Sequence, residues 1–256
     1  MKSYSLCLFL LASLSLGAAA ETYQANTKLP GVTSISEFAG RWEQKVPAED
    51  GWQNRGWIEE SFTPGGDDPA SHHQVMSLPD GRKVINHRLL QAGSLMPIST
   101  RQTLEGFPDG APKSVSFEFH ERRVVKNTEA ADGQVTTEEG LLSTSGWDGS
   151  IFGLALAALD LKPGDSHRIP SVMGSFLGAY WVDLTVSTAD PVTLKDGTSK
   201  ALLRVDVEWI NLQDGAIYPG GPDESGGSYY LFEDPPPGVS PVYRYINNGA
   251  DIVMDL

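Results

Sequence analysis

Apolar and polar residues alternate at every second position over several stretches of the chain. The stretches 115–120, 180–187 and 203–209 each place apolar side chains at one parity and polar side chains at the other. Successive side chains of a β-strand point to opposite faces, so this pattern predicts antiparallel strands with one buried and one solvated face. The chain is therefore expected to be all-β, forming a strongly curved antiparallel sheet or an open β-barrel.

The dipeptide Asp-Gly recurs between these stretches. It occurs at 50–51, 80–81, 109–110, 132–133, 148–149, 196–197 and 214–215. Glycine has no Cβ and adopts positive φ without strain, and aspartate tolerates the left-handed region, so the pair suits type I′ hairpin turns. We therefore expect tight hairpins between neighbouring strands.

The segment 150–159 departs from the alternating pattern. It is rich in alanine and leucine and apolar nearly all round, which predicts a short buried helix of about three turns at roughly 150–160. Asp148 stands where an N-cap is expected, and the sequence Lys-Pro-Gly at 162–164 ends the helix. The helix is expected to pack against the concave side of the sheet or to plug the mouth of a barrel.

The first twenty residues have the features of an export signal. Lys2 precedes an apolar run at 6–16, and three alanines at 18–20 form an A-x-A cleavage site. The run is too short to span a membrane, so the chain is expected to be exported and released as a soluble protein, with 21–256 as one all-β domain. The only cysteine, Cys7, lies within the signal, so the mature domain is expected to fold without disulfides.

The charge of the chain excludes some partners. It has 33 acidic and 19 basic residues and a formal net charge of −14. A negative surface repels phosphate backbones and anionic lipid headgroups, so neither nucleic-acid binding nor peripheral membrane binding is expected. Stable membrane insertion is not expected either, because the sequence contains no spanning segment. Solubility alone is a sufficient reason for such a charge.

Common catalytic motifs are missing from the sequence. It contains no P-loop, no Rossmann glycine pattern, no H-E-x-x-H and no G-x-S-x-G, because the serine in 174–178 stands one place too early. No cofactor is predicted. His72 and His73 are adjacent, so in a strand they point to opposite faces and cannot easily share one ion. No metal site is predicted, and both histidines are expected at the surface or in turns.

Three carboxylates are weak catalytic candidates. Asp206 and Glu208 lie two apart on one predicted strand face, about 7 Å from each other, which is a separation typical of inverting glycoside hydrolases. Arg204 shares that face, and a solvated face of mixed charge is the commoner reason for such a pattern. Glu224 lies in a glycine-rich stretch that is either functional or simply a long exposed loop.

Several aromatic residues are candidates for a ligand site. Trp52 and Trp57 flank the polar stretch 53–56, and exposed indoles beside amides and arginine suit stacking of a sugar or an apolar ligand. Trp181 and Tyr229 are further candidates. The alternative is that the tryptophans and tyrosines mainly fill the core.

Strand parity assigns some of these ring side chains to the interior. Tyr180 and Trp209 share parity with apolar residues and are expected in the core. His87 shares parity with Ile85 and Leu89, which predicts that it points inward. A buried neutral imidazole needs a partner for each ring nitrogen, so His87 is either a satisfied core histidine or a ligand contact.

The C-terminal part of the chain resembles a group of exported bacterial β-proteins of unknown function. The matching features are an apolar helix leading into 163–170, a strand with Tyr180-Trp181, the sequence Gly-Ser-Tyr-Tyr-Leu at 227–231, Pro235-Pro236 and Arg244-Tyr245. The resemblance implies a Gram-negative periplasmic location and a curved antiparallel sheet or incomplete barrel. It implies no catalytic residues.

The leading functional hypothesis is a non-catalytic protein that binds or carries an apolar or amphipathic component of the cell envelope, a lipid or a saccharide, in its concave space. One alternative is a carbohydrate-active enzyme that uses paired carboxylates on envelope saccharides. Another is an envelope assembly or interaction module that uses exposed sheet edges. The sequence leaves the oligomeric state open.

Overall fold

The computed structural model describes residues 21–24, 27–49, 51–174, 177–211, 226–247 and 249–256. Its strands are β1 (Glu21–Thr22), β2 (Phe38–Ala48), β3 (Gly51–Thr63), β4 (Ala70–Ser77), β5 (Lys83–Leu90), β6 (Pro97–Glu105), β7 (Ser114–His120), β8 (Arg123–Glu129), β9 (Val135–Leu141), β10 (Trp147–Asp148), β11 (Ser166–Met173), β12 (Gly178–Thr193), β13 (Ser199–Asn211), β14 (Gly226–Phe232), β15 (Val242–Asn247) and β16 (Ala250–Met254). A short 3₁₀-helix, η1 (Val32–Ser34), precedes β2.

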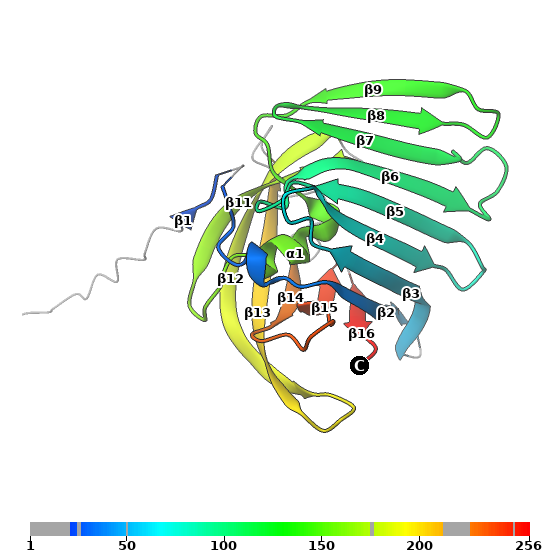
Figure 1. Ribbon diagram of the computed structural model, residues 1–256. Helices are drawn as coiled ribbons and strands as arrows, with labels where there is room; N and C mark the ends of the chain where they lie inside the picture. The colour runs from blue at the N-terminus through cyan, green and yellow to red at the C-terminus, as the bar shows by residue number, and fades with distance from the viewer. Residues whose placement is uncertain (1–20, 25–26, 50, 175–176, 212–225, 248) are drawn as a thin grey trace, which may run out of the picture.

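All of these strands belong to one sheet. The hydrogen-bonded order is β1-β11-β12-β13-β14-β15-β16-β2-β3-β4-β5-β6-β7-β8-β9, and β10 pairs with β11 beside this path. The sheet curls round so that β11–β14 face β3–β6 across a concave space, with β1 and β9 as its two edges (Figure 1). The predicted fold, a strongly curved and unclosed antiparallel sheet with one short helix, is confirmed.

The predicted helix lies in this concave space. It begins as a 3₁₀ turn, η2 (Gly149–Ile151), and continues as α1 (Phe152–Ala157). The Asp148 side chain accepts a hydrogen bond from the Ser150 backbone N–H at 2.9 Å, which confirms the predicted cap. The helix ends earlier than predicted, at Ala157, and Asp160 adopts the left-handed region with φ 51°.

Three of the Asp-Gly pairs form a different turn from the one predicted, while Asp50 and the pair 214–215 lie outside the described residues. In the hairpins at 78–82, 130–134 and 194–198 the glycine N–H bonds to the carbonyl three residues back, and the flanking residues bond to each other. Gly81, Gly133 and Gly197 have positive φ whereas the preceding aspartates do not, so these are three-residue loops with a bulge glycine rather than type I′ turns. Asp148-Gly149 is not a hairpin at all, because it caps the helix.

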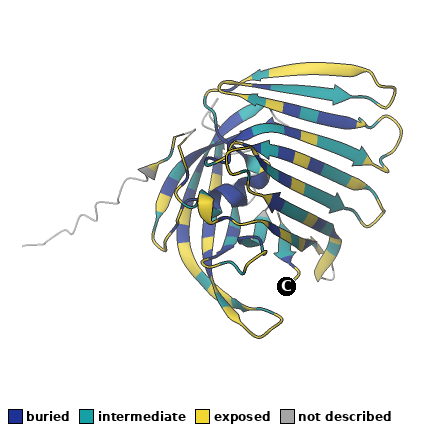
Figure 2. Ribbon diagram, viewed as in Figure 1, coloured by how far each residue is buried: buried dark blue, intermediate teal, exposed yellow. Residues whose placement is uncertain are grey.

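The inner face of β11–β14 is apolar and forms most of the core with α1. Ile169, Val182, Leu184 and Val205 are each at most 1% exposed (Figure 2). Phe152 of α1 packs against Trp209 of β13, with ring centroids 5.0 Å apart. Tyr180 and Trp209 are both buried, which confirms their assignment to the core.

A smaller cluster brings the two ends of the sheet together. Val115, Phe117 and Val124 of β7 and β8 pack with Val172 and Ala179 of β11 and β12. Nearby, β9 approaches the start of β12 so closely that a Cβ on Gly140 would lie 2.6 Å from the Cβ of Leu177. The open barrel is therefore held at this end by side-chain packing rather than by a further pair of strands.

Candidate ligand-binding cavity

A cavity of about 410 Å³ lies between α1 and the inner face of the sheet. It occupies the side of the concave space formed by β3–β6 and β14–β16, opposite the filled core of β11–β13. Much of its wall is apolar. The side chains on that part of the wall include Trp42, Ile58, Met76, Phe152, Tyr229 and Ile252.

Four charged or titratable side chains form a chain at the other part of the wall, where Glu60 and Arg88 line the cavity and His72 and Asp148 lie behind them. Glu60 Oε1 lies 2.7 Å from His72 Nε2, and Arg88 Nη1 lies 3.2 Å from His72 Nδ1. Arg88 Nε is in turn 3.8 Å from Asp148 Oδ2. His72, Arg88 and Asp148 are 0%, 3% and 5% exposed, so this chain crosses the interior from β3 to the helix cap.

The hydrogen bonds of His72 define which of its ring nitrogens carries the proton. A guanidinium donates and cannot accept, so His72 Nδ1 accepts from Arg88 and carries no proton. His72 Nε2 then carries the proton and donates it to the Glu60 carboxylate. The imidazole is neutral, and the chain therefore holds one positive charge, on Arg88, between the negative charges of Glu60 and Asp148.

Arg88 has an unsatisfied donor at this site. Burial lowers the pKa of Arg88, while the negative charges of Asp148 and Glu60 act in the opposite direction. A guanidinium has so high a pKa in water that it stays charged. Its Nε has no hydrogen-bond partner among the described residues, although buried donors are nearly always paired. Arg88 lines the cavity, so a bound molecule is one available source of an acceptor.

A ladder of amides continues the polar wall across three strands. Asn86 donates to Gln74 at 3.3 Å, and Gln102 donates to Asn86 at 3.1 Å. All three side chains line the cavity. Since strand register pairs Gln74 with Asn86 and Asn86 with Gln102, the ladder follows directly from the sheet.

Two stacked tyrosines close the cavity on the side of β14 and β15. The rings of Tyr229 and Tyr245 lie 4.2 Å apart between centroids and are nearly parallel, at 19°. Burial raises the pKa of the Tyr229 hydroxyl well above its ordinary value, and the neighbouring Tyr245 contributes to the shift. Tyr229 therefore stays protonated at neutral pH.

The cavity contains one of the five side chains predicted from the sequence to bind a ligand. Tyr229 lines it, whereas Trp52, Trp57 and Trp181 do not. Trp52 is 57% exposed near the β2–β3 turn. The Trp57 ring has the guanidinium of Arg41 over it at 4.0 Å, so that face is already covered.

The predicted inward orientation of His87 is wrong. His87 is exposed, and its Nε2 lies 3.3 Å from the hydroxyl of Ser71 on the outer side of the sheet. The inner face of β5 carries Asn86, Arg88 and Leu90 instead. The parity was misassigned because polar residues, which normally mark the solvated face, here line the interior.

The predicted surface position is also wrong for one of the paired histidines. His72 is fully buried and belongs to the charged chain, while His73 is exposed. The two point to opposite faces, as their positions in one strand require. Among the described residues no group of three or more His, Cys, Asp or Glu side chains is arranged to hold a metal ion.

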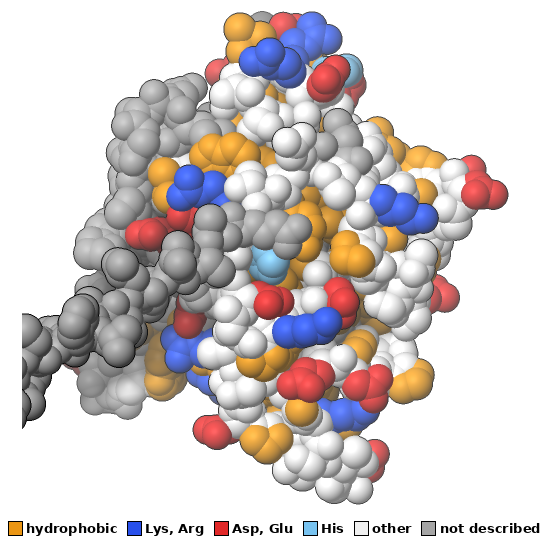
Figure 3. Space-filling model, turned by 90° about the vertical axis from the view of Figure 1, so that its left-hand side faces the viewer, with side chains coloured by type: hydrophobic (Ala, Val, Ile, Leu, Met, Phe, Trp, Pro, Cys, Tyr) orange, Lys and Arg blue, Asp and Glu red, His pale blue; other side chains and the backbone are white. Residues whose placement is uncertain are grey.

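The candidate catalytic carboxylates lie outside the cavity. Asp206 and Glu208 are on the outer face of β13, and Asp206 is 2.9 Å from the Nε of Arg204. A broad depression there contains both residues, but the described residues that line it include no tryptophan or tyrosine. Glu224 lies outside the described residues. Figure 3, which views the molecule from the side of β11 and β12, shows acidic and basic side chains interspersed.

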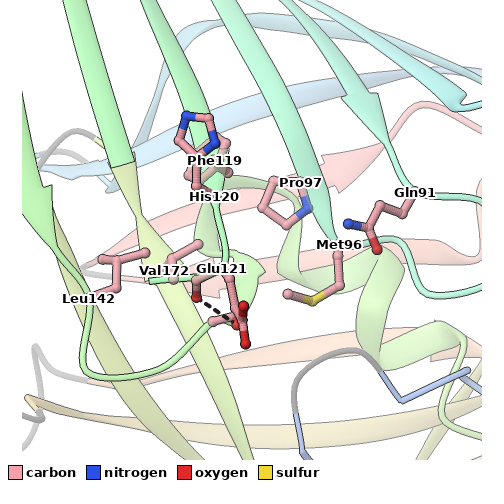
Figure 4. Close-up of a pocket in the computed structure, with 10 residues that line it drawn as sticks. Gln91, Met96, Pro97, Phe119, His120, Glu121, Leu142 and Val172 are labelled. Atoms are coloured by element: carbon pink, nitrogen blue, oxygen red, sulfur yellow. Dashed lines mark hydrogen bonds between the residues drawn. The ribbon is translucent and has the colours of Figure 1, made fainter. Parts of the chain in front are cut away.

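A second, smaller cavity lies where the loop before β6 meets the end of β7. Its volume is about 210 Å³, and Met96, Phe119 and Leu142 line it together with His120 (Figure 4). The hydroxyl of Ser145 donates to the carbonyl of Glu121 at 2.8 Å at its edge. Ligand pockets typically have volumes of about 300–1,000 Å³, so the cavity beside α1 is the better candidate.

Sequence reasoning missed the polar wall, although a signal for it exists. The turn at Asp80-Gly81 fixes the register of β4 and β5, and that register places His72 opposite Arg88 and Gln74 opposite Asn86. Polar residues that face each other across two strands mark a polar face. The position of Asp148 beside Arg88 depends on the tertiary fold and has no such local signal.

Comparison with known proteins agrees with the architecture. No family model and no curated protein matches the chain. A crystal structure described as a β-barrel-like protein of the domain of unknown function DUF1849, from Brucella abortus, is similar with a TM-score of 0.51. The match covers 86% of this chain and 96% of that one at 8% sequence identity, so the similarity is one of fold alone. The chain thus has a β-rich, barrel-like fold that it shares with a protein of unknown function.

Proposed function

We propose that this protein binds an apolar or amphipathic small molecule in the cavity beside α1, as a non-catalytic carrier or binding protein. The observation that carries the proposal is the cavity itself. Its volume, about 410 Å³, is within the range of small-molecule sites. A mainly apolar wall with a few fixed polar groups is the usual composition of such a site.

The proposal includes export to the periplasm, where the ligand would be a component of the cell envelope. The predicted signal at 1–20 lies outside the described residues. Cleavage after residue 20 would leave Glu21 as the first residue of the mature chain, and β1 begins there, paired with β11. Removal of the signal would therefore keep every described strand. Intact mass spectrometry of protein from a periplasmic extract tests this, with a mature chain of 21–256 as the expected result.

Among the described residues no helix is long and apolar enough to cross a membrane.

Ligand binding is tested by blocking the cavity. Val84 lines it, whereas the next residue, Ile85, has the opposite parity and is not part of its wall. We expect the neutral probe N-phenyl-1-naphthylamine to bind the unaltered protein with a saturable rise in fluorescence. The affinity of the Val84→Trp variant for the probe should be lower by at least about tenfold, because the indole occupies the space that the probe needs.

The matched control is Ile85→Trp, which adds the same indole on the outer face of the same strand. Its affinity for the probe should equal that of the unaltered protein. Equal binding by both variants, or no saturable binding by any of the three proteins, contradicts the proposed function. Circular dichroism spectra of the two variants establish that each retains the sheet.

A further inference from the structure

We propose that the ligand of this cavity carries a neutral headgroup rich in hydroxyl groups, as in an alkyl glycoside, rather than an acidic or cationic headgroup. The inference rests on the proposed function, because it assigns the chemistry of a molecule in the same cavity. It places the headgroup against the polar wall and the hydrocarbon against α1 and β16.

The charges of the polar wall exclude an acidic headgroup. Glu60 and Asp148 are negative, Arg88 is positive and His72 is neutral by its hydrogen bonds, which leaves one negative charge in excess. Glu60 and Arg88 line the cavity directly, and the side chain of Glu60 is 16% exposed. A carboxylate or phosphate would have to share Arg88 with Glu60 and Asp148, and it would raise the excess from one negative charge to at least two, which is costly in a largely apolar space.

A cationic headgroup is disfavoured by the donors on the same wall. Arg88 presents a fixed positive charge and a buried Nε that has no hydrogen-bond partner among the described residues. An ammonium group only donates hydrogen bonds, so it would leave that donor unsatisfied and lie close to a like charge.

The amide ladder matches a group that both donates and accepts. Its internal hydrogen bonds use the carbonyl oxygen of Gln74 and the amide nitrogen of Gln102. Within the described residues no hydrogen bond uses the amide nitrogen of Gln74, the carbonyl oxygen of Gln102 or the second carboxylate oxygen of Glu60, so these atoms remain for a ligand. A hydroxyl group is both donor and acceptor, so a polyol can satisfy all three.

The apolar wall suits the remainder of such a molecule. Ile58, Met76 and Ile252 line it, and the Trp42 indole N–H already donates to the Val242 carbonyl at 3.3 Å. Because that donor is occupied, Trp42 offers the ligand an aromatic surface rather than a polar contact. An alkyl chain or the apolar face of a sugar ring can pack there.

The experiment compares three probes with the same chain and different headgroups. Octyl β-glucoside, octanoate and octylammonium are titrated into the protein by calorimetry below their critical micelle concentrations, with N-phenyl-1-naphthylamine as the reference for an open cavity. We expect octyl β-glucoside to bind about tenfold more tightly than octanoate or octylammonium. Val84→Trp should abolish this binding and Ile85→Trp should not.

A pair of adjacent glutamates tests whether the excess negative charge in the cavity disfavours an acidic headgroup. Glu60→Gln removes the excess charge inside the cavity, while Glu59→Gln removes a charge from the exposed face of the same strand. Glutamine at 60 can still accept from His72, so the fold should be kept. The ratio of octanoate to octyl β-glucoside affinity should rise about tenfold in Glu60→Gln and stay unchanged in Glu59→Gln.

The outcomes separate the two proposals. If the naphthylamine binds but the three octyl probes bind equally, or octanoate or octylammonium binds best, the headgroup inference is wrong and the proposed function stands. The same holds if the naphthylamine binds and none of the octyl probes does. If the naphthylamine does not bind either, both proposals fail.

Discussion

The inner faces of β11–β13 and of β3–β6 belong to one sheet but differ in chemistry, because the first is apolar and the second combines apolar with polar and charged side chains. The first carries side chains such as Ile169, Leu184 and Val205, which are at most 1% exposed and belong to one core cluster with the residues of α1. The second carries Glu60, the amide ladder and Arg88, and the cavity lies against it. Figure 2 shows buried positions on both faces, so burial alone does not distinguish them.

This difference explains where the cavity is. Apolar side chains gain free energy when a gap between them closes, so the inner face of β11–β13 packs into one core with the helix. The polar side chains of β3–β6 are held by hydrogen bonds to one another and cannot move onto an apolar helix without losing them. The two halves of the barrel therefore have different roles. The apolar half, β11–β13, stabilises the fold, and the polar half, β3–β6, keeps a site open.

Breaking the charged chain should have the largest effect. Arg88→Met removes the positive charge that lies between Asp148 and Glu60 and leaves the buried Asp148 carboxylate with hydrogen bonds from Thr100 and Ser150 but without a cation. The free energy of unfolding should fall by about 3–5 kcal/mol, measured by urea denaturation.

The control for this prediction is a second substitution. Arg88→Met combined with Asp148→Asn removes both charges, while asparagine can still cap η2. The double variant should recover about 1–3 kcal/mol of the loss. If the free energy of unfolding of Arg88→Met is unchanged, the prediction is wrong, and the charged chain contributes as little to stability as an exposed ion pair does.

A substitution in the apolar half should act on stability alone. Leu184 is 1% exposed on the inner face of β12, and Leu184→Ala should cost about 2–5 kcal/mol in urea denaturation. Thr185→Ala, one residue along on the exposed face, should change stability by less than about 0.5 kcal/mol. Folded Leu184→Ala should bind the naphthylamine as the unaltered protein does. A selective loss of probe affinity would contradict the division of roles.

The sequence predicts the apolar half much better than the polar half. In 203–209 only one parity is apolar, and in 180–187 Trp181 is the single apolar residue at the other parity. Alternation therefore identifies the inner face directly, and Tyr180 and Trp209 are buried as expected. In 83–90 both parities carry apolar side chains, Ile85 and Leu89 on one and Val84 and Leu90 on the other. Alternation then cannot select a face, and the assignment of His87 to the interior fails.

The candidate site depends on contacts that alternation does not contain. Arg88 is stable in the interior because Asp148, at the end of β10, lies beside it and His72 of β4 accepts a hydrogen bond from it. Those partners satisfy a buried charge that the pattern alone would place in solvent. Cross-strand register, which follows from the Asp80-Gly81 turn, is the part of this information that the sequence does hold.

Tyr229 lies at the border of the two halves and gives a prediction for alkaline pH. Burial raises its pKa, so the protonated hydroxyl favours the folded state. That contribution is fully present below the unfolded pKa of about 10 and is lost as the pH rises through the higher folded value. The stability of the unaltered protein should therefore fall more steeply above about pH 10 than that of Tyr229→Phe. Urea denaturation at several pH values gives the free energy of unfolding of each protein. If the two free energies fall in parallel with rising pH, ionisation of Tyr229 does not destabilise the folded state.

The smallest effect is expected at the edge strand β9, which belongs to neither inner face. Leu141 is 82% exposed and Val135 58% exposed, so truncation there removes almost no buried surface. Leu141→Ala should change the free energy of unfolding by less than about 0.5 kcal/mol. The next residue, Leu142, is 4% exposed in the small cluster that joins the ends of the sheet, and Leu142→Ala should cost about 2–5 kcal/mol. A loss of more than about 1 kcal/mol in Leu141→Ala that depends on protein concentration would mean that β9 is covered by another molecule in solution.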